Sequence, residues 1–98
     1  MWARITTIQG LPDRVNGGIH HFRDQFVPVA SGLRGFRGAY LLVDRKSAKF
    51  LGISLWETER ELRASEAVSS RLRAQGAEAL GTTESPAVEI FEVVVQPE

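Results

Sequence analysis

The chain has 98 residues, of which 43% are hydrophobic and 24% charged, and its formal net charge at pH 7 is zero. These values are typical of one globular domain with a modest core. The absence of cysteine excludes disulfides, thiolate chemistry and cysteine-ligated metals. No apolar run is long enough to cross a membrane and no export signal is visible, so we expect a single cytoplasmic domain over residues 1–98, with no membrane partner.

The charges are unevenly divided between the two halves of the chain. Residues 1–50 contain eight Lys or Arg and three Asp or Glu, whereas residues 51–98 contain four and nine. We expect the two halves to interleave in space and neutralise each other. No arginine cluster alternates with stacking aromatic residues, as an RNA-binding sheet requires, so we expect no nucleic-acid partner.

The first third of the chain predicts one strand and one helix. Residues 2–8 are rich in β-branched and aromatic side chains, which is typical of a strand. Pro12 suits the first turn of a helix, and Pro28 predicts a kink or a frayed end. Between them an apolar stripe follows helical spacing through Val15, Ile19, Phe22, Phe26 and Ala30.

The remainder predicts a hairpin, a second helix and a last strand. Residues 36–44 and 49–57 are joined by a connection short enough for an antiparallel hairpin. A continuous helix is expected over residues 59–80, ending at Gly81. Thr58 and Glu61 have the spacing of a capping box, in which each side chain accepts the other residue's backbone N–H. Residues 82–86 then form a loop, and residues 88–95 a strand.

This order of elements, βαββαβ, predicts an α+β ferredoxin-like fold. Right-handed crossovers give a four-stranded antiparallel sheet in the order 4-1-3-2, with both helices on one face. The strands alternate poorly, because residues 41–43 and 93–95 are consecutive apolar residues. Both faces of the sheet are therefore expected to be buried, and two helices can cover only one. A second copy packed sheet to sheet, in a homodimer, is the simplest cover for the other.

The pattern resembles a known family over nearly the whole chain. With Gly35-Phe36 opening the second strand and Leu55-Trp56-Glu57-Thr58 leading into the capped helix, it resembles the antibiotic biosynthesis monooxygenase-like (ABM) proteins. The resemblance implies a dimeric α+β barrel with a pocket between the sheet and the helices of each protomer. That superfamily includes cofactor-independent quinol oxygenases, haem-degrading oxygenases, isomerases and members without a known activity.

The haem-degrading branch of that superfamily has an asparagine on its first strand, and a tryptophan and a histidine in its second helix. Ala3, Ser65 and Gln75 stand at the corresponding positions of this chain, so we do not expect haem degradation. The quinol oxygenases have polar and aromatic groups in the same helix, where this chain has the small residues Ser65 and Ser69.

Two side chains are candidates for proton transfer. His20 and His21 are the only imidazoles, and a helical wheel places His20 at the margin of the apolar stripe and His21 nearly opposite, in solvent. Adjacent histidines cannot share one metal ion from the same helix face, so no metal site is expected. We therefore consider His20 as a general base, with a plain boundary residue as the alternative. Tyr40, the only tyrosine, is either a hydrogen-bond donor to a ligand oxygen or an amphipathic aromatic at a sheet face or dimer contact.

Small residues on the second helix predict space for a ligand. Ser65, Ser69 and Gly76 stand where a packed core would carry larger apolar side chains. We expect either a small, mostly apolar cavity with the two serines as polar contacts, or close packing in which Phe22 and Phe26 fill the gap. Trp56 would stack on a flat ligand, or else anchor the core or the dimer.

The sequence therefore predicts a homodimer that binds a small hydrophobic or aromatic compound between sheet and helices, without a cofactor. Its activity, if it is an enzyme, is expected to be a cofactor-independent oxidation or isomerisation. The alternative is a non-catalytic ligand-binding or structural dimer with a fully packed core.

Overall fold

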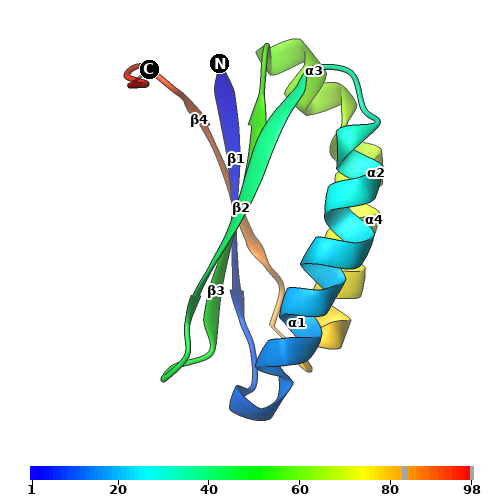
Figure 1. Cartoon of the computed structure of the whole chain (residues 1–98), viewed down its shortest axis with the longest axis vertical. Helices are drawn as coiled ribbons and strands as arrows, with labels where there is room; N and C mark the ends of the chain where they lie inside the picture. Colours follow the sequence, from blue (N-terminus) through cyan, green and yellow to red (C-terminus); the bar gives the residue numbers. More distant parts are fainter. Residues whose placement is uncertain (83, 98) are drawn as a thin grey trace.

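Four antiparallel strands form one sheet, and two helical segments cover one of its faces (Figure 1). This is seen in a computed structural model that describes residues 1–82 and 84–97; Thr83, within the expected loop, lies outside the described residues. The strands are β1 (Trp2–Gln9), β2 (Phe36–Asp44), β3 (Lys49–Trp56) and β4 (Ala87–Glu92). Their order, β2-β3-β1-β4, is the predicted order 4-1-3-2 counted from the other edge, so the ferredoxin-like fold is confirmed.

The strand register decides which residues face the helices. β1 pairs with β3 so that Arg4 lies opposite Ser54 and Thr6 opposite Gly52, and β2 pairs with β3 so that Leu41 also lies opposite Gly52. Directly paired residues of an antiparallel sheet share a face. The even-numbered residues of β1 and β3 therefore point toward the helices, together with Ala39, Leu41 and Val43 of β2. A bulge between Phe36 and Gly38 shifts the register at the start of β2, so that Phe36 pairs with Trp56.

The first helical segment is less regular than the sequence predicts. It consists of η1 (Pro12–Arg14), α1 (Val15–His21), a π-helical turn η2 (Phe22–Phe26) and α2 (Val27–Ser31). The kink predicted near Pro28 is present as this π-helical turn. Proline has no N–H, and its ring collides with the carbonyl four residues earlier, here Asp24, so the turn before it widens.

The second helical segment is broken at Ser65, so the prediction of one continuous helix is wrong there. It divides into α3 (Glu59–Ala64) and α4 (Glu66–Ala79). The Leu62 carbonyl at the break accepts hydrogen bonds from Ser65 Oγ at 2.6 Å and from an Arg4 nitrogen at 2.8 Å. These side-chain donors compete with the helical pattern and tighten the last turn of α3.

The ends of this segment follow the sequence more closely. The Glu61 N–H donates to Thr58 Oγ1 at 3.1 Å, which is the expected cap. The second half of the capping box differs, because the Glu61 carboxylate accepts from the Thr58 hydroxyl instead of its backbone N–H. At the other end Gly81 has a positive φ of 70°, and the N–H groups of Gly81 and Thr82 bond back to Glu78 and Ala77. Gly81 is thus the C-terminal cap in a Schellman arrangement.

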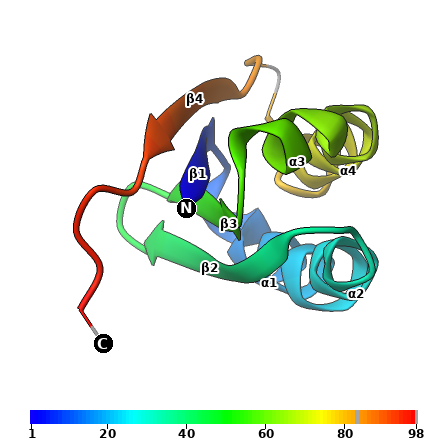
Figure 2. The same cartoon turned by 90° about the horizontal axis from the view of Figure 1, so that it is seen from above.

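β4 ends at Glu92, three residues before the predicted end, and Val94 and Val95 are each 80% exposed. β4 cannot continue because β1, the strand with which it pairs, begins at Trp2, and the Val93 N–H already donates to the carbonyl of Met1, the first residue. The segment after β4 extends on the side of the sheet away from the helices (Figure 2).

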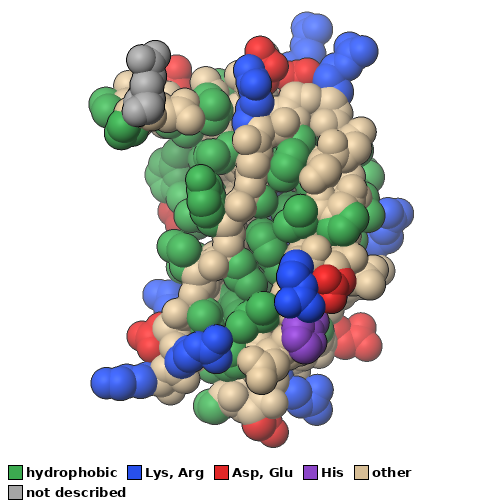
Figure 3. Space-filling model, in the orientation of Figure 1, with side chains coloured by type: hydrophobic (Ala, Val, Ile, Leu, Met, Phe, Trp, Pro, Cys, Tyr) green, Lys and Arg blue, Asp and Glu red, His purple; other side chains and the backbone are tan. Residues whose placement is uncertain are grey.

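The sheet face opposite the helices is apolar and uncovered. Register places several apolar side chains on it, namely Ile5, Tyr40, Leu42, Leu51, Ile53, Leu55 and Phe91. Among them Tyr40 is 60% and Leu42 is 50% exposed. Hydrophobic side chains gather over the sheet side of the molecule, while charged ones lie at its ends and along the helices (Figure 3). The two halves of the chain do interleave, because ion pairs such as Arg4–Glu66 and Arg37–Glu57 join them.

Candidate functional site

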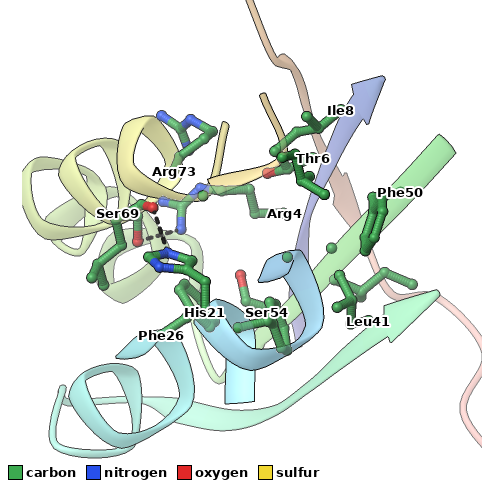
Figure 4. A pocket seen from close by; sticks show the side chains of 17 residues that line it. Arg4, Thr6, Ile8, His21, Phe26, Leu41, Phe50, Ser54, Ser69 and Arg73 are labelled. Atoms are coloured by element: carbon green, nitrogen blue, oxygen red, sulfur yellow. Dashed lines mark hydrogen bonds between the residues drawn. The ribbon is translucent and has the colours of Figure 1, made fainter. Parts of the chain in front are cut away.

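A cavity lies between the inner face of the sheet and the two helical segments (Figure 4). The volume open to the centres of water-sized molecules is about 70 Å³. A single water needs roughly 10–15 Å³ on such a measure, so the space suits a small organic molecule. Most of its wall is apolar, formed by Ile8, Phe22, Phe26, Leu41, Phe50 and Leu72.

Arg4, from the centre of β1, forms the polar end of the cavity. Its side chain is only 3% exposed and binds the helical layer at the break between α3 and α4. One terminal nitrogen donates to Ser69 Oγ at 2.9 Å, and the other to the Leu62 carbonyl and to Ser65 Oγ at 3.1 Å. The guanidinium carbon also lies 5.9 Å from the centre of the Trp56 ring, within range of a cation–π interaction.

Two further charged residues stand beside Arg4. Glu66, the first residue of α4, forms an ion pair with Arg4 at 3.1 Å and also binds Arg73, about two turns further along the same face of α4. Arg73 lines the cavity, and its side chain is 14% exposed. The Glu66 carboxylate is therefore shared between the guanidinium groups of Arg4 and Arg73. Burial lowers the pKa of Arg4 from its ordinary value, and the Glu66 carboxylate opposes that shift while the Arg73 charge adds to it.

Arg4 has one donor that the described part of the chain does not satisfy. Its Nε is buried and has no hydrogen-bond partner among the described residues. An unpaired buried N–H costs about 1–3 kcal/mol, and more when the group is charged. Because Arg4 is one of the residues that line the cavity, an acceptor atom that reaches this side chain would satisfy Nε.

The π-helical turn supplies the aromatic wall. Phe22 and Phe26 both line the cavity, and their rings stack with centroids 4.9 Å apart and planes inclined by 22°. Across from them lies Gly52 of β3, where a Cβ would lie 3.6 Å from Phe22 Cε2, so the Phe22 ring packs over a position of the sheet that has no side chain. Single π-helical turns are frequently found at functional sites. Here the turn brings two aromatic rings to the same side of the helix.

His21, rather than His20, is the imidazole of the cavity. Its Nε2 lies 3.0 Å from the Leu72 carbonyl, and because a carbonyl only accepts, Nε2 carries a hydrogen. The ring fits against α4 because residue 76 is glycine, where a Cβ would lie 3.2 Å from His21 Cδ2. In the neutral ring the hydrogen on Nε2 leaves Nδ1 as the acceptor.

The other sequence candidates are divided between the cavity and places outside it. Ser69, Phe22 and Phe26 line the cavity. Ser65 and Trp56 are buried beside it without lining it: Ser65 binds Arg4, and Trp56 Nε1 donates to Ser54 Oγ at 2.9 Å. His20 is exposed on α1, and Tyr40 is exposed on the opposite face of the sheet. The helical-wheel placement of the two histidines was therefore wrong.

The sequence does not predict the charged end of the cavity, which Arg4 and Arg73 form, because arginine usually lies in solvent. One signal was present: Trp2, Arg4, Thr6 and Ile8 alternate along β1, so an inward-facing Trp or Ile implies an inward-facing Arg4.

The described residues contain no group of three or more His, Cys, Asp or Glu placed to hold a metal ion. Within the same residues no helix has the length and apolar character of a membrane span.

A four-stranded ferredoxin-like sheet with a cavity under its helices defines a fold class that solved structures share. The monooxygenase ActVA-Orf6 of Streptomyces coelicolor, solved in complex with Nanaomycin D, superposes with a TM-score of 0.77 at 14% identity, covering 99% of this chain and 92% of that one. A Deinococcus radiodurans protein classed with the antibiotic biosynthesis monooxygenases has a TM-score of 0.78 at 11% identity, with 100% and 97% covered. Rv0793 of Mycobacterium tuberculosis superposes with a TM-score of 0.74 at 17% identity, covering 99% of this chain and 98% of that one.

The chain therefore has the fold of the antibiotic biosynthesis monooxygenase proteins, and the resemblance inferred from its residues is confirmed for the fold. No family model matches the sequence. The uncharacterized protein Rv2557 of Mycobacterium tuberculosis strain H37Rv is 40% identical over 93 residues, which are 95% of this chain and 41% of that protein. Rv2558 of the same strain is 43% identical over 65 residues, 66% of this chain and 28% of that protein. The chain thus spans about two fifths or less of the length of these curated relatives.

Proposed function

We propose that this chain binds a small hydrophobic or aromatic compound in the cavity between its sheet and its helices. The observation that carries the proposal is the cavity itself, with its apolar wall, its stacked Phe22–Phe26 pair and its few polar groups at one end. Natural ligand sites combine these features. A protein of the same fold, ActVA-Orf6, was solved with Nanaomycin D bound. The alternative expectation, a structural dimer with a fully packed core, is disfavoured by the same cavity.

A pocket-filling substitution tests this proposal. Gly52→Leu places an isobutyl group in the cavity opposite Phe22, whereas Ala74→Leu adds a comparable group to the solvent-exposed side of α4. Titration with the neutral compounds benzyl alcohol and 2-naphthalenemethanol, followed by amide chemical shifts, should perturb cavity residues in the wild type. We expect the perturbation to be lost in Gly52→Leu and kept in Ala74→Leu. Binding that is unchanged in Gly52→Leu, or absent from the wild type, contradicts the proposal.

A second candidate function is a cofactor-independent oxidation or isomerisation, and it is favoured by the position of His21. This imidazole lines the cavity and is held by the Leu72 carbonyl, which suits it to take a proton from a bound phenol or carbon acid. The sequence candidates His20 and Tyr40 would need a ligand that reaches out of the cavity. His21→Gln should therefore lower any turnover far more than His20→Gln or Tyr40→Phe. Equal rates in His21→Gln and the wild type would remove His21 from this role.

We further propose that the chain forms a homodimer through the apolar face of the sheet. The support is the exposed apolar set on that face, with Tyr40 and Leu42 at least half exposed, since uncovered patches of this kind mark interaction sites. Leu42→Glu should give a monomer in sedimentation equilibrium at micromolar concentration. The control Val29→Glu, at an exposed valine on α2, should leave the dimer intact. A monomeric wild type would contradict the proposal.

A further inference from the structure

The charges at the polar end of the cavity do not balance. Arg4 and Arg73 contribute two positive charges, and Glu66 binds both with a single negative one. The other nearby guanidinium, Arg63, has its own partner in Glu59 at 3.0 Å. The Arg4–Glu66–Arg73 cluster thus keeps one positive charge in excess at the wall of an apolar cavity. Charges in such surroundings are costly unless they are paired.

The unpaired donor points to the same need. Arg4 binds Ser69, Ser65, the Leu62 carbonyl and Glu66 through its terminal nitrogens, and yet its Nε has no acceptor among the described residues. Arg73 lines the same cavity with its side chain mostly buried. A negatively charged oxygen group that enters the cavity would therefore satisfy both the orphan N–H and the excess charge. Hydrogen bonds between ionised partners are roughly twice as strong as neutral ones.

The rest of the cavity restricts what carries that oxygen group. The stacked pair Phe22–Phe26 presents flat aromatic faces to the cavity, and these favour an aromatic ring over a branched chain as the apolar part of the ligand. One excess positive charge matches a monoanion better than a phosphate dianion. A carboxylate is ionised at neutral pH, whereas an ordinary phenol, with a pKa of about 10, is not.

From this geometry we propose that the ligand of the cavity is a small aromatic carboxylic acid. Its carboxylate binds Arg4 Nε and the Arg73 guanidinium, and its ring lies against the Phe22–Phe26 stack. This inference rests on the proposed function, because it names the chemical class of the compound that occupies the same cavity. It assigns Arg4 and Arg73 as the residues that select for charge, while the apolar wall selects for shape.

Matched pairs of acid and alcohol separate the charge from the ring. Benzoate and 2-naphthoate are titrated by calorimetry at pH 7 beside the neutral benzyl alcohol and 2-naphthalenemethanol. In the wild type each acid should bind about tenfold or more tightly than its alcohol, since one charge-assisted hydrogen bond suffices for that ratio. In Arg73→Met and Arg73→Gln the acid should fall to the level of the alcohol, while the affinity for the alcohol stays within about twofold.

Two further variants control for net charge and for folding. Arg71→Met removes an equal charge from the exposed side of α4 and should keep the preference for the acid. Glu66→Gln removes the competing carboxylate, so the acids should bind several-fold more tightly while the alcohols do not change. Thermal unfolding followed by circular dichroism verifies that every variant is folded.

The outcomes distinguish this inference from the proposed function. If acid and alcohol bind equally well to the wild type, or if Arg71→Met abolishes the preference as fully as Arg73→Met, the carboxylate inference is overturned and the binding proposal stands. If neither compound of either pair binds, both are overturned. Binding of both compounds with a preference for the acid, which is lost in both Arg73 variants and kept in Arg71→Met, supports both.

Discussion

The two ends of the layer between sheet and helices are held together by different means. At one end Val15, Ala48, Phe50 and Leu80 form a dry cluster in which every member is at most 6% exposed. At the other end Arg4 crosses the layer and binds the hydroxyls and carbonyl at the break between α3 and α4. Apolar side chains are stabilised in proportion to their contact area, so they pack together until little space is left between them. Directional hydrogen bonds hold the layers at a set distance instead, and the cavity lies between the two ends.

The largest effect is expected at the apolar end. Phe50 is 1% exposed, and Phe50→Ala removes its ring from the centre of the cluster. We expect the free energy of unfolding to fall by about 3–5 kcal/mol, the usual loss for a buried phenylalanine. Urea denaturation measures this, with Val29→Ala, at an exposed site on α2, as the control that should change stability by no more than about 0.5 kcal/mol. A loss below that of the control would mean that the cluster does not hold this end.

Two adjacent glycines of α1 provide a second test of the close packing at the apolar end. A Cβ at Gly18 would lie 2.4 Å from Leu80 Cδ2, whereas one at Gly17 would meet the Ala79 carbonyl at an ordinary 3.4 Å. Gly18→Ala should therefore destabilise the protein by about 1–3 kcal/mol through overpacking. Gly17→Ala should stabilise it by up to about 1 kcal/mol, because alanine favours the helix. Equal melting temperatures for the two variants would show that α1 does not pack this closely on α4.

At the polar end we expect Arg4→Met to reduce stability less than Phe50→Ala does, although the Arg4 side chain forms several hydrogen bonds and an ion pair. In Arg4→Met the Ser65–Leu62 bond and the Glu66–Arg73 pair remain, and methionine fills part of the vacated space. Exchange of a buried ionic group for an apolar one is often nearly neutral, so we expect a loss of no more than about 2 kcal/mol. Arg4→Ala leaves a void as well and should lose more. Urea denaturation of the two variants tests whether Arg4 serves binding more than stability; a loss for Arg4→Met as large as that for Phe50→Ala would contradict this view.

The smallest effect concerns the start of α3. Thr58 caps this helix through Oγ1, so Thr58→Ala should reduce stability by about 1 kcal/mol. Thr58→Ser keeps the oxygen and should retain most of it. Thermal unfolding of the two variants is sufficient, and a Thr58→Ser variant as unstable as Thr58→Ala would assign the role to the methyl group rather than to the cap.

Local signals predicted the elements well where local chemistry decides them. The cap at Thr58, the Schellman glycine at Gly81 and the short hairpin connection each depend on a few neighbouring residues, and the structure contains all three. The histidines show where such reasoning fails. A helical wheel based on apolar residues omits glycine, but Gly18 is buried against Leu80, and His21 follows it on the same face of α1.

The pattern of residues along the chain determined the order of the strands, the placement of both helices on one side of the sheet and the small residues that leave space beneath them. It did so because periodicity and turn chemistry act over short distances. Only the tertiary structure decided that Arg4 on β1 meets Glu66 and Arg73 on α4, more than sixty residues later. An arginine in a strand has no local signature of burial, since its charge becomes tolerable only when partners from another layer arrive. The charged end of the cavity is therefore a product of packing.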